Sequence, residues 1–432
     1  MTERALAPAL PPDPGLPGVR GLFRGGGADL LGPFLASRSW SLVESRPVQV
    51  TYQPERSCLV RYRVRAVNRG GELRVLSLSA ETRHSPGRAV APHPQFEERY
   101  GLSRPVERID PYLVWAYPYD PSLEGLPDAA WGPAVRERLA AAGRPLRAVA
   151  VQPLRYRPRR RAVFRYTGLR GGRLSAGPRA LFGKVLRSAK VERWGRVSAL
   201  RVRRRPPVRL AVPMASPGTG PLLFEPLEGR SLRDILVSGG PLPSPDRVAR
   251  LLDDLPRVLG DHGGDRDVER PLRTAGTTRD LVARVIPEAT ARADRLVDLV
   301  SEGVRGDAVP PRTIHGDLYE AQVFVGREYS LGLIDLDDVG PGDPAMDAGN
   351  FLAHLVALAL AFPSAGRRVL AYRTLMRTAF LDRLDLDPAE LAWREALEMF
   401  QLALGPLRTL NPRWPHEVNR RFDLALRLGE AA

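Results

Sequence analysis

The sequence predicts an α+β fold, with a β-rich front half followed by a mostly helical back half. Two hairpin patterns, at residues 47–67 and 154–169, dominate the front half. Helical periodicity takes over after Ser231, and a short island of strands rich in carboxylates interrupts it at residues 313–338. Strands first and helices afterwards are typical of α+β proteins.

Length and composition exclude several classes of protein. The 432 residues are enough for two or three domains, and 43% hydrophobic with 26% charged residues is ordinary for a soluble chain. The best apolar run, 351–362, contains His354 and predicts a buried helix, so no membrane partner is expected. Residues 1–19 are Pro-rich without the apolar core of a signal peptide, and we expect them to be disordered. Cys58 is the single cysteine, which excludes an internal disulfide and favours a cytoplasmic protein.

The net charge of +16 has two interpretations. One is a polyanionic partner such as nucleic acid. The other is an arginine-rich composition with no role in binding. Among 65 basic residues only Lys184 and Lys190 are lysines, which favours the second interpretation, and nucleic acid is not the expected partner. The charge also disfavours a polycationic substrate.

The front half contains a sequence repeat. Residues 47–67 predict two strands joined by a tight turn at Pro54. When residues 52–62 are laid over 156–166, Tyr, Pro, Arg, Arg and Tyr coincide at five of eleven positions. A further β-like run follows each hairpin, at 73–81 and 179–187. The pattern indicates a duplicated sheet unit.

The remaining elements follow in chain order. Residues 188–203 have a helical pattern, and 221–236 predict a strand, a turn and a helix capped by Ser231. The Gly- and Arg-rich stretch 262–279 predicts a mobile connection, and 280–305 a helical region. After the strands of the island, the chain is predicted to be mostly helical to its end.

The island carries the chemistry. Its segments are "TIHGDLYEAQVFV" (313–325) and "SLGLIDLDDVG" (330–340), and two adjacent strands there would bring Gln322 and Asp335 together. An amide oxygen and a carboxylate suit Mg²⁺, which takes further ligands from water and phosphates. Asp317, on the preceding turn, can accept a hydroxyl proton and orient the hydroxyl for attack. The alternative is a set of turn and capping carboxylates without a metal.

This order of residues resembles the aminoglycoside phosphotransferase family, whose fold is the protein-kinase-like two-lobe fold. The resemblance implies an ATP-dependent transfer of phosphate to a hydroxyl of a small molecule, with ATP and Mg²⁺ as cofactors. It implies roles for six residues: Asp317 as catalytic base, Gln322 and Asp335 as metal ligands with Asp337 as a further carboxylate, His315 as a brace of the loop, and Asp347 as the tie between the loop and a helix.

Gln322 departs from the Asn that most family members have at this position. Gln offers the same amide oxygen one methylene further out and is similar to the variant of maltokinase-like branches. We interpret it as a longer ligand. A catalytically inactive kinase is the alternative.

A kinase-like site also needs a cation for the nucleotide phosphates. Lys184 lies within the strand pattern "ALFGKVLR", in a chain that otherwise uses arginine, and its predicted role is a point charge on the phosphates. The alternative is a solvent-facing lysine on an edge strand. Glu192 is the one acidic residue between Lys184 and Phe224, and by the resemblance it pairs with Lys184.

The nucleotide would meet two further segments. No G-x-G-x-x-G precedes Lys184, so the covering hairpin would be residues 155–164, with backbone amides and Arg160 facing the nucleotide. An ordinary exposed basic hairpin is the alternative. Residues 222–232 resemble the family's hinge, where adenine would bind the main chain near Glu225 and Leu227. A connection without a ligand is the alternative.

The expected domains are a disordered N-terminus (1–19), a degenerate N-lobe-like domain (20–145), a nucleotide-binding N-lobe (146–230) and a helical C-lobe (231–432). The C-lobe would hold the catalytic loop in 313–347 and the acceptor-binding helices in 355–432. The matching strand of the first sheet reads "LSLSAET", without a lysine, so the first domain is not expected to bind nucleotide. The acceptor would be a sugar or another alcohol, met by a tail that includes Glu395, Glu398, Asn411 and Trp414. A regulatory or scaffold protein on the same fold is the alternative from another class.

Overall fold

The computed structural model describes residues 10–84, 95–170, 179–188, 190–192, 194, 208–214, 220–259, 267, 269–305 and 311–430. The predicted helical stretch 188–203 therefore lies mostly outside the described residues. The chain forms two compact units. Unit 1 contains residues 1–195, 213–226 and 407–414, and unit 2 contains residues 196–212, 227–406 and 415–432. The mixture of sheets and helices confirms the predicted α+β class.

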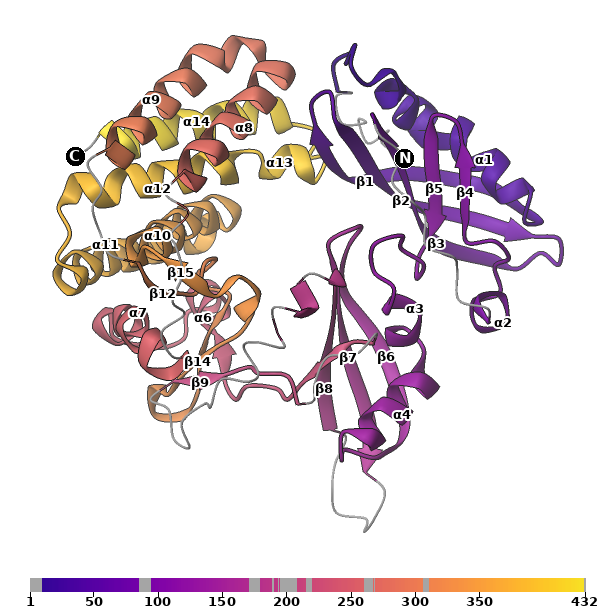
Figure 1. The fold of residues 1–432 in the computed structure, drawn as a ribbon, viewed down its shortest axis with the longest axis horizontal. Coiled ribbons are helices and arrows are strands. Elements are labelled where there is room, and N and C mark those ends of the chain that lie inside the picture. Colours follow the sequence, from indigo (N-terminus) through magenta and orange to yellow (C-terminus); the bar gives the residue numbers. More distant parts are fainter. Residues whose placement is uncertain are drawn as a thin grey trace. The chain divides into compact units, whose positions relative to one another are not determined.

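Unit 1 is built on two antiparallel sheets (Figure 1). The first, sheet A, has five strands in the order β1 (Trp40–Gln53), β2 (Ser57–Asn68), β3 (Leu73–Arg83), β5 (Tyr112–Ala116) and β4 (Val106–Ile109). The short helices beside it are η1 (Pro17–Leu22), η2 (Arg24–Gly27), α1 (Ala28–Ala36) and α2 (Phe96–Tyr100). Along β2 every second side chain is buried, at Val60, Tyr62, Val64 and Ala66, as the two-residue period of a strand requires.

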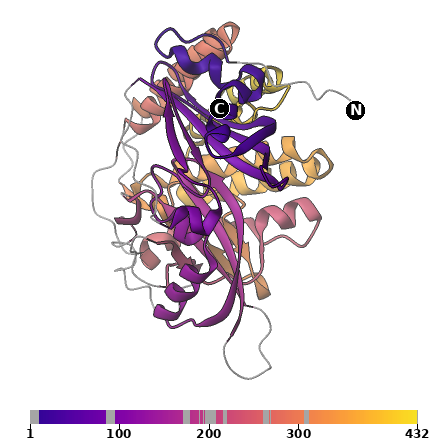
Figure 2. The same ribbon diagram turned by 90° about the vertical axis from the view of Figure 1, so that its right-hand side faces the viewer.

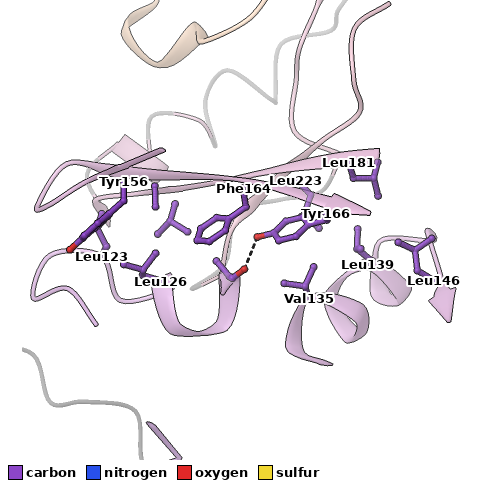
Figure 3. Close-up of a cluster of buried hydrophobic side chains, with 13 residues drawn as sticks. Leu123, Leu126, Val135, Leu139, Leu146, Tyr156, Phe164, Tyr166, Leu181 and Leu223 are labelled. Atoms are coloured by element: carbon purple, nitrogen blue, oxygen red, sulfur yellow. Dashed lines mark hydrogen bonds between the residues drawn. The ribbon is translucent and has the colours of Figure 1, made fainter. Parts of the chain in front are cut away.

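The second sheet, sheet B, has four strands in the order β10 (Leu222–Phe224), β8 (Arg179–Leu186), β7 (Arg161–Arg170) and β6 (Leu146–Arg157). Helices α3 (Leu126–Ala129) and α4 (Gly132–Ala141) accompany it, and α4 packs against β6 (Figures 1 and 2). Figure 3 shows the buried side chains between this sheet and the helices, with the rings of Phe164 and Tyr166 at the centre. Burial of this cluster holds the helices on one face of the sheet.

The start of the chain is anchored to sheet A by Asp13. The buried Asp13 carboxylate accepts hydrogen bonds from the Tyr52 hydroxyl at 2.7 Å, from the backbone N–H of Glu55 at 2.8 Å and from that of Gly15 at 3.1 Å. Leu16 is also buried. The predicted disorder of residues 1–19 is therefore wrong for residues 10–19, because hydrogen bonds to the buried Asp13 carboxylate hold this segment. Residues 1–9 lie outside the described part.

The same anchor recurs at sheet B. The Asp120 carboxylate accepts from the Tyr156 hydroxyl, from the N–H of Arg159 and from the N–H of Ser122, each at 2.8 Å. Tyr156 matches Tyr52 in the sequence repeat, and each donor has its counterpart around Asp13. Both anchors therefore hold the tip of a hairpin in the same way.

A second pair of hydrogen bonds repeats as well. The Tyr62 hydroxyl donates to the carbonyl of Leu22 at 2.6 Å, and the matching Tyr166 hydroxyl donates to the carbonyl of Ala129 at 2.9 Å (dashed in Figure 3). Each bond ties the second strand of a hairpin to the helical segment before it. The two sheets thus share their strand register and their buried polar contacts, as a duplicated unit requires.

Unit 2 holds most of the longer helices and two small sheets. One sheet has the order β11 (Arg230–Ser231), β13 (Val323–Val325), β14 (Leu331–Leu333) and β9 (Arg209–Leu210), and the other pairs β12 (Arg312–Ile314) with β15 (Gly340–Gly342). The helices are α6 (Leu232–Ser238), α7 (Pro245–Leu259), α8 (Arg270–Val285), η3 (Pro287–Ala289), α9 (Thr290–Arg305), η4 (Arg327–Tyr329), η5 (Leu336–Asp338), α10 (Pro344–Ala361), η6 (Pro363–Ala365), α11 (Gly366–Leu384), α12 (Pro388–Ala403) and α14 (Trp414–Glu430). The short α13 (Gly405–Arg408) crosses the boundary between the units.

Two predictions about this unit have clear outcomes. Ser231 caps α6 as predicted, because its side chain accepts from the N–H of Asp234 at 3.1 Å. The mobile connection predicted for 262–279 is wrong from Arg270 onwards, where α8 begins. Ala275, Thr278 and Val282 of α8 are buried, and packing against α9 outweighs the low helix propensity of the glycine in this stretch.

Helix α10 is the core of unit 2. Within the described part of the chain it is the one helix whose length and hydropathy would suit a membrane span, yet 72% of that span is buried inside the protein. It packs against α11 and α12. The predicted buried helix at 351–362 is confirmed.

The Asp13 anchor yields a stability prediction. Asp13→Ala leaves the buried Tyr52 hydroxyl and two backbone N–H groups without their acceptor, which we expect to cost about 2 kcal/mol or more. The urea midpoint of the variant measures this loss. Asp29→Ala, at an exposed carboxylate on α1, is the matched control and should unfold like the wild type. Equal midpoints for both variants would show that the start of the chain is not held by Asp13.

Candidate active site

The loop between β12 and β13 is held by one buried carboxylate on α10. Asp347 accepts from the backbone N–H of His315 at 2.7 Å, from that of Gly316 at 3.0 Å and from that of Leu318 at 3.3 Å. Burial raises the pKa of Asp347, while the nearby His315 and these amide donors favour the ionised form. Asp347 lies in the first turn of α10, where the helix dipole also stabilises a negative charge.

Two neighbours complete the shape of this loop. Gly316 has φ +81°, and a Cβ there would lie 2.4 Å from the carbonyl oxygen of Asp338, so no other residue fits. The buried His315 places Nε2 3.0 Å from the carbonyl oxygen of Ile334, which a proton on Nε2 would bridge. His315 thereby connects the loop to the end of β14.

Asp317 and Gln322 lie together on this loop. The Gln322 Nε2 donates to Asp317 Oδ2 at 3.5 Å, and Gln322 Oε1 accepts from the N–H of Tyr319 at 3.2 Å. Gln322 is buried, whereas Asp317 is partly exposed. In this arrangement the amide orients the Asp317 carboxylate and leaves it accessible to a ligand.

Asp335 and Asp337 follow directly after β14. The N–H of Ile334 donates to the carbonyl of Gln322 at 3.1 Å, which brings this strand end beside the loop. Asp335 has φ +66°, a left-handed conformation that costs free energy for a residue with a side chain. Such backbone strain is frequent at ligand sites.

The donor set can be tested against a metal. Among the described residues, no group of three or more His, Cys, Asp or Glu side chains is arranged to hold a metal ion. Asp335, Asp337 and Gln322 would offer two carboxylates and an amide oxygen, and Mg²⁺ accepts such a sparse protein shell because it keeps water and phosphate ligands. The Gln322 oxygen accepts one hydrogen bond and has a second lone pair. The set fits Mg²⁺ in chemistry, and the metal roles stay predictions.

The tail residues named from the sequence have different surroundings. Glu395 is buried in an ion pair with Arg373, with Nε 2.8 Å from Oε1, and Asn411 accepts from the N–H of Arg413 at 2.8 Å within a turn. Trp414 is buried. Glu398 differs, because burial first and the negative charge of Asp317 second raise its pKa to about 7. The sequence placed Glu398 in the acceptor-binding tail but did not single it out, since an isolated Glu on a helix carries no signal.

A buried pair beside the loop escaped sequence reasoning as well. Glu320 and His354 approach to 4.0 Å between Oε2 and Nδ1, and the ring of Tyr319 stacks on His354 with centroids 4.1 Å apart. Burial raises the pKa of Glu320 to about 7 and lowers that of His354 to about 4. Near neutral pH His354 is therefore uncharged, and Glu320 is about half protonated.

The predicted nucleotide residues lie mainly in unit 1. Lys184 is buried on β8, opposite Val163 of β7 and Leu222 of β10, so it is not on an edge strand. Glu192 is exposed on the helical residues that follow, and its pairing with Lys184 stays a prediction.

Arg160 is exposed at the tip of the β6–β7 hairpin, and the Glu225 carboxylate is 2.9 Å from Nη2 of Arg144. The boundary between the two units falls between Pro226 and Leu227, within the segment that resembles a hinge. The roles of these residues towards a nucleotide remain predictions.

Comparison with known proteins places these features in a family. The model of the family described as "Phosphotransferase enzyme family" matches residues 189–408, just over half of the chain. The match includes the loop with Asp317 and Gln322, the strand end with Asp335, and most of the helical tail. No curated protein matches the chain.

Several solved structures are similar to the chain but share little sequence with it. A thermostable mutant of an aminoglycoside phosphotransferase is 12% identical, with 68% of this chain and 99% of that chain covered and a TM-score of 0.48. Choline kinase from Cryptosporidium parvum Iowa II is 9% identical, with 66% and 89% covered and a TM-score of 0.42. A macrolide 2'-phosphotransferase type I is 19% identical, with 67% and 96% covered and a TM-score of 0.42.

The Glu320–His354 pair yields a pH prediction. Between about pH 4.5 and 7, folded Glu320 holds a proton that the unfolded chain releases, so its contribution to stability falls as pH rises. Between about pH 4 and 6.5, unfolded His354 binds a proton that the folded chain excludes, so its contribution falls as pH falls. The two effects oppose each other in the wild type.

Glu320→Gln should leave only the His354 effect. Relative to the wild type, this variant should lose stability as the pH is lowered from 8 to 5, as measured by urea midpoints at both values. Glu328→Gln, at an exposed position on η4, should show no such change relative to the wild type. A Glu320→Gln difference that is the same at both pH values would contradict the shifted pKa of Glu320.

Proposed function

The chain belongs to the phosphotransferase enzyme family, and from this premise we propose that it moves the γ-phosphate of ATP to a hydroxyl of a small molecule. Family membership makes it a small-molecule phosphotransferase with the protein-kinase-like fold predicted from the sequence. The identity of the donor nucleotide, the role of Mg²⁺ and the hydroxyl acceptor belong to the proposal.

The loop geometry carries the proposal. Asp317 lies on a turn that Asp347 anchors through three backbone N–H groups, and Gln322 orients its carboxylate. A fixed and accessible carboxylate suits a base that accepts the acceptor's proton. The hydroxyl oxygen would then bond to the γ-phosphorus, the bond from that phosphorus to the ADP oxygen would break, and the proton would pass to Asp317.

Two groups of residues would balance the charge of the phosphates. Asp335, Asp337 and Gln322 would hold Mg²⁺, which when bound offsets negative charge on the phosphates. Lys184 would supply a further positive charge, steadied by Glu192. Catalysis would then consist mainly of positioning and electrostatic stabilisation, as is general for phosphoryl transfer.

The acceptor would bind in unit 2 near Asp317. Glu398 on α12 is close enough to Asp317 for their charges to interact, and its side chain accepts from Gln401 Nε2 at 2.9 Å. A carboxyl group at that place can hydrogen-bond to hydroxyl groups. The net charge of +16 opposes a polycationic acceptor, so we favour a sugar or another neutral alcohol.

Replacement of the proposed base tests the reaction. Asp317→Asn keeps the size of the side chain but removes the proton acceptor, so acceptor-dependent ADP release should fall roughly a hundredfold or more while ATP still binds. The assay follows ADP release from Mg·ATP across a panel of hydroxylated small molecules. Asp298→Asn, at an exposed position on α9, is the control and should act like the wild type. Full acceptor-dependent release by Asp317→Asn would reject the assignment.

Replacement of a proposed metal ligand tests the cofactor. Asp335→Asn removes one negative charge from the donor set, so nucleotide binding in the presence of Mg²⁺ should weaken while binding without Mg²⁺ stays unchanged. Titration of ATP with and without Mg²⁺ measures both. An equal effect of Mg²⁺ in the variant and the wild type would remove Asp335 from the metal site.

A further inference from the structure

The two sheets of unit 1 share a register, which allows their strands to be compared position by position. Tyr52 lies opposite Cys58 in sheet A, and Tyr156 lies opposite Ala162 in sheet B. Each tyrosine also donates its hydroxyl to an anchoring aspartate. The two tyrosines are therefore equivalent, and positions counted from them correspond.

The position of Lys184 has a counterpart in sheet A. Lys184 pairs with Val163, which stands seven residues after Tyr156, and Glu81 pairs with Leu59, which stands seven residues after Tyr52. Glu81 thus occupies in sheet A the place that Lys184 occupies in sheet B. The charge at this position is reversed between the two copies.

Glu81 binds an arginine from the other copy. The buried Glu81 carboxylate lies 2.6 Å from Nη2 of Arg159, which stands at the tip of the β6–β7 hairpin. The guanidinium lies 5.2 Å from the centre of the Trp115 ring on β5, and Nη1 donates to Ser122 Oγ at 3.1 Å. Glu81 in sheet A therefore binds a guanidinium group. A lysine at this position, as in sheet B, would instead attract a phosphate.

The main chain of Arg159 is held at the same time. Arg159 has φ +59°, a left-handed conformation, and its N–H donates to Asp120 Oδ2 at 2.8 Å. Tyr156 donates to the same oxygen and accepts from Trp115 Nε1 at 3.1 Å, so the anchor continues into sheet A. Backbone and side chain of the tip residue are both fixed by contacts outside the hairpin.

We infer that sheet A is a second copy of the nucleotide lobe that serves as a clamp, in which Glu81 and Arg159 are positioning residues that fix the hairpin over the nucleotide. This inference rests on the proposed function, in which that hairpin covers ATP. The charge of the Arg159 side chain is directed at Glu81. Arg159 would contribute to nucleotide binding by fixing the conformation of the hairpin. A hairpin already fixed in its binding conformation loses less entropy when the nucleotide binds.

The ion pair also explains why residues 20–145 would not bind nucleotide themselves. A buried carboxylate at the lysine position repels phosphates, and Arg159 already occupies the space beside it. Burial raises the pKa of Glu81, whereas Arg159 and Arg83 favour its charged form. The first domain would therefore contribute to the reaction by holding the hairpin of the second domain in place.

The test uses the full chain and four variants. Glu81→Gln, Arg159→Gln and the double variant remove the ion pair from either side or both. Glu72→Gln is the matched control, because Glu72 lies next to β3 and pairs with Arg74 at 2.6 Å on an exposed surface. Hydrogen exchange of the amides of residues 157 and 159–161 reports the hairpin without any nucleotide, and calorimetry with Mg·ATP reports binding.

Loss of the ion pair should make the hairpin amides exchange about tenfold faster in Glu81→Gln. Affinity for Mg·ATP should fall by a similar factor if the fixed conformation becomes a minority. The double variant should resemble the single variants, since all of them remove one interaction. The control should match the wild type in both measurements.

The outcomes separate this inference from the proposed function. A wild type that binds Mg·ATP, with Glu81→Gln equal to it in exchange and affinity, overturns the clamp alone. Additive effects of the two substitutions also overturn it, because the residues would then act independently. A wild type that binds no Mg·ATP overturns the proposed function and with it the role of the clamp in nucleotide binding.

Discussion

The carboxylate of Asp347 is the contact on which the candidate active site depends. It accepts three backbone N–H groups of the loop that carries Asp317, and it stands on the most buried helix of unit 2. Those amides have no strand partner at this turn, and buried donors without an acceptor are costly. One side chain therefore gives the turn its shape and connects it to the core. Gly316 and His315 complete the shape of this turn.

Much of the fold and part of the site could be predicted from the sequence, for local reasons. The hairpins carry β-type residues around turn residues, and Ser231 precedes a helical pattern, so neighbours along the chain determine these elements. The loop residues from His315 to Asp347 could be found because their order resembles one family. The helix at Arg270 was missed, because packing against α9 decides it.

Contacts between distant residues could not be predicted in this way. Asp13 reaches Tyr52, and Glu81 reaches Arg159, through the arrangement of strands in space. The repeat could be seen in the sequence. The buried polar contacts that the two copies share could not be predicted, because no local pattern marks them. The two sheets share a frame of tyrosines and aspartates and carry opposite charges at the equivalent positions Glu81 and Lys184. The same arrangement of strands can therefore serve two roles: sheet B would bind the nucleotide, and sheet A would hold the hairpin of sheet B.

The central claim is that unit 1 binds a magnesium nucleotide through Lys184, which separates a working phosphotransferase from a scaffold on the same fold. The chain has two lysines, so Lys190→Met is a matched control for Lys184→Met. Calorimetry with Mg·ATP is the most direct measurement. The account predicts binding by the wild type and by Lys190→Met, and affinity at least about tenfold lower for Lys184→Met, because a charge-assisted contact to phosphate is lost. Absence of binding by the wild type, or equal affinity in Lys184→Met, would contradict it.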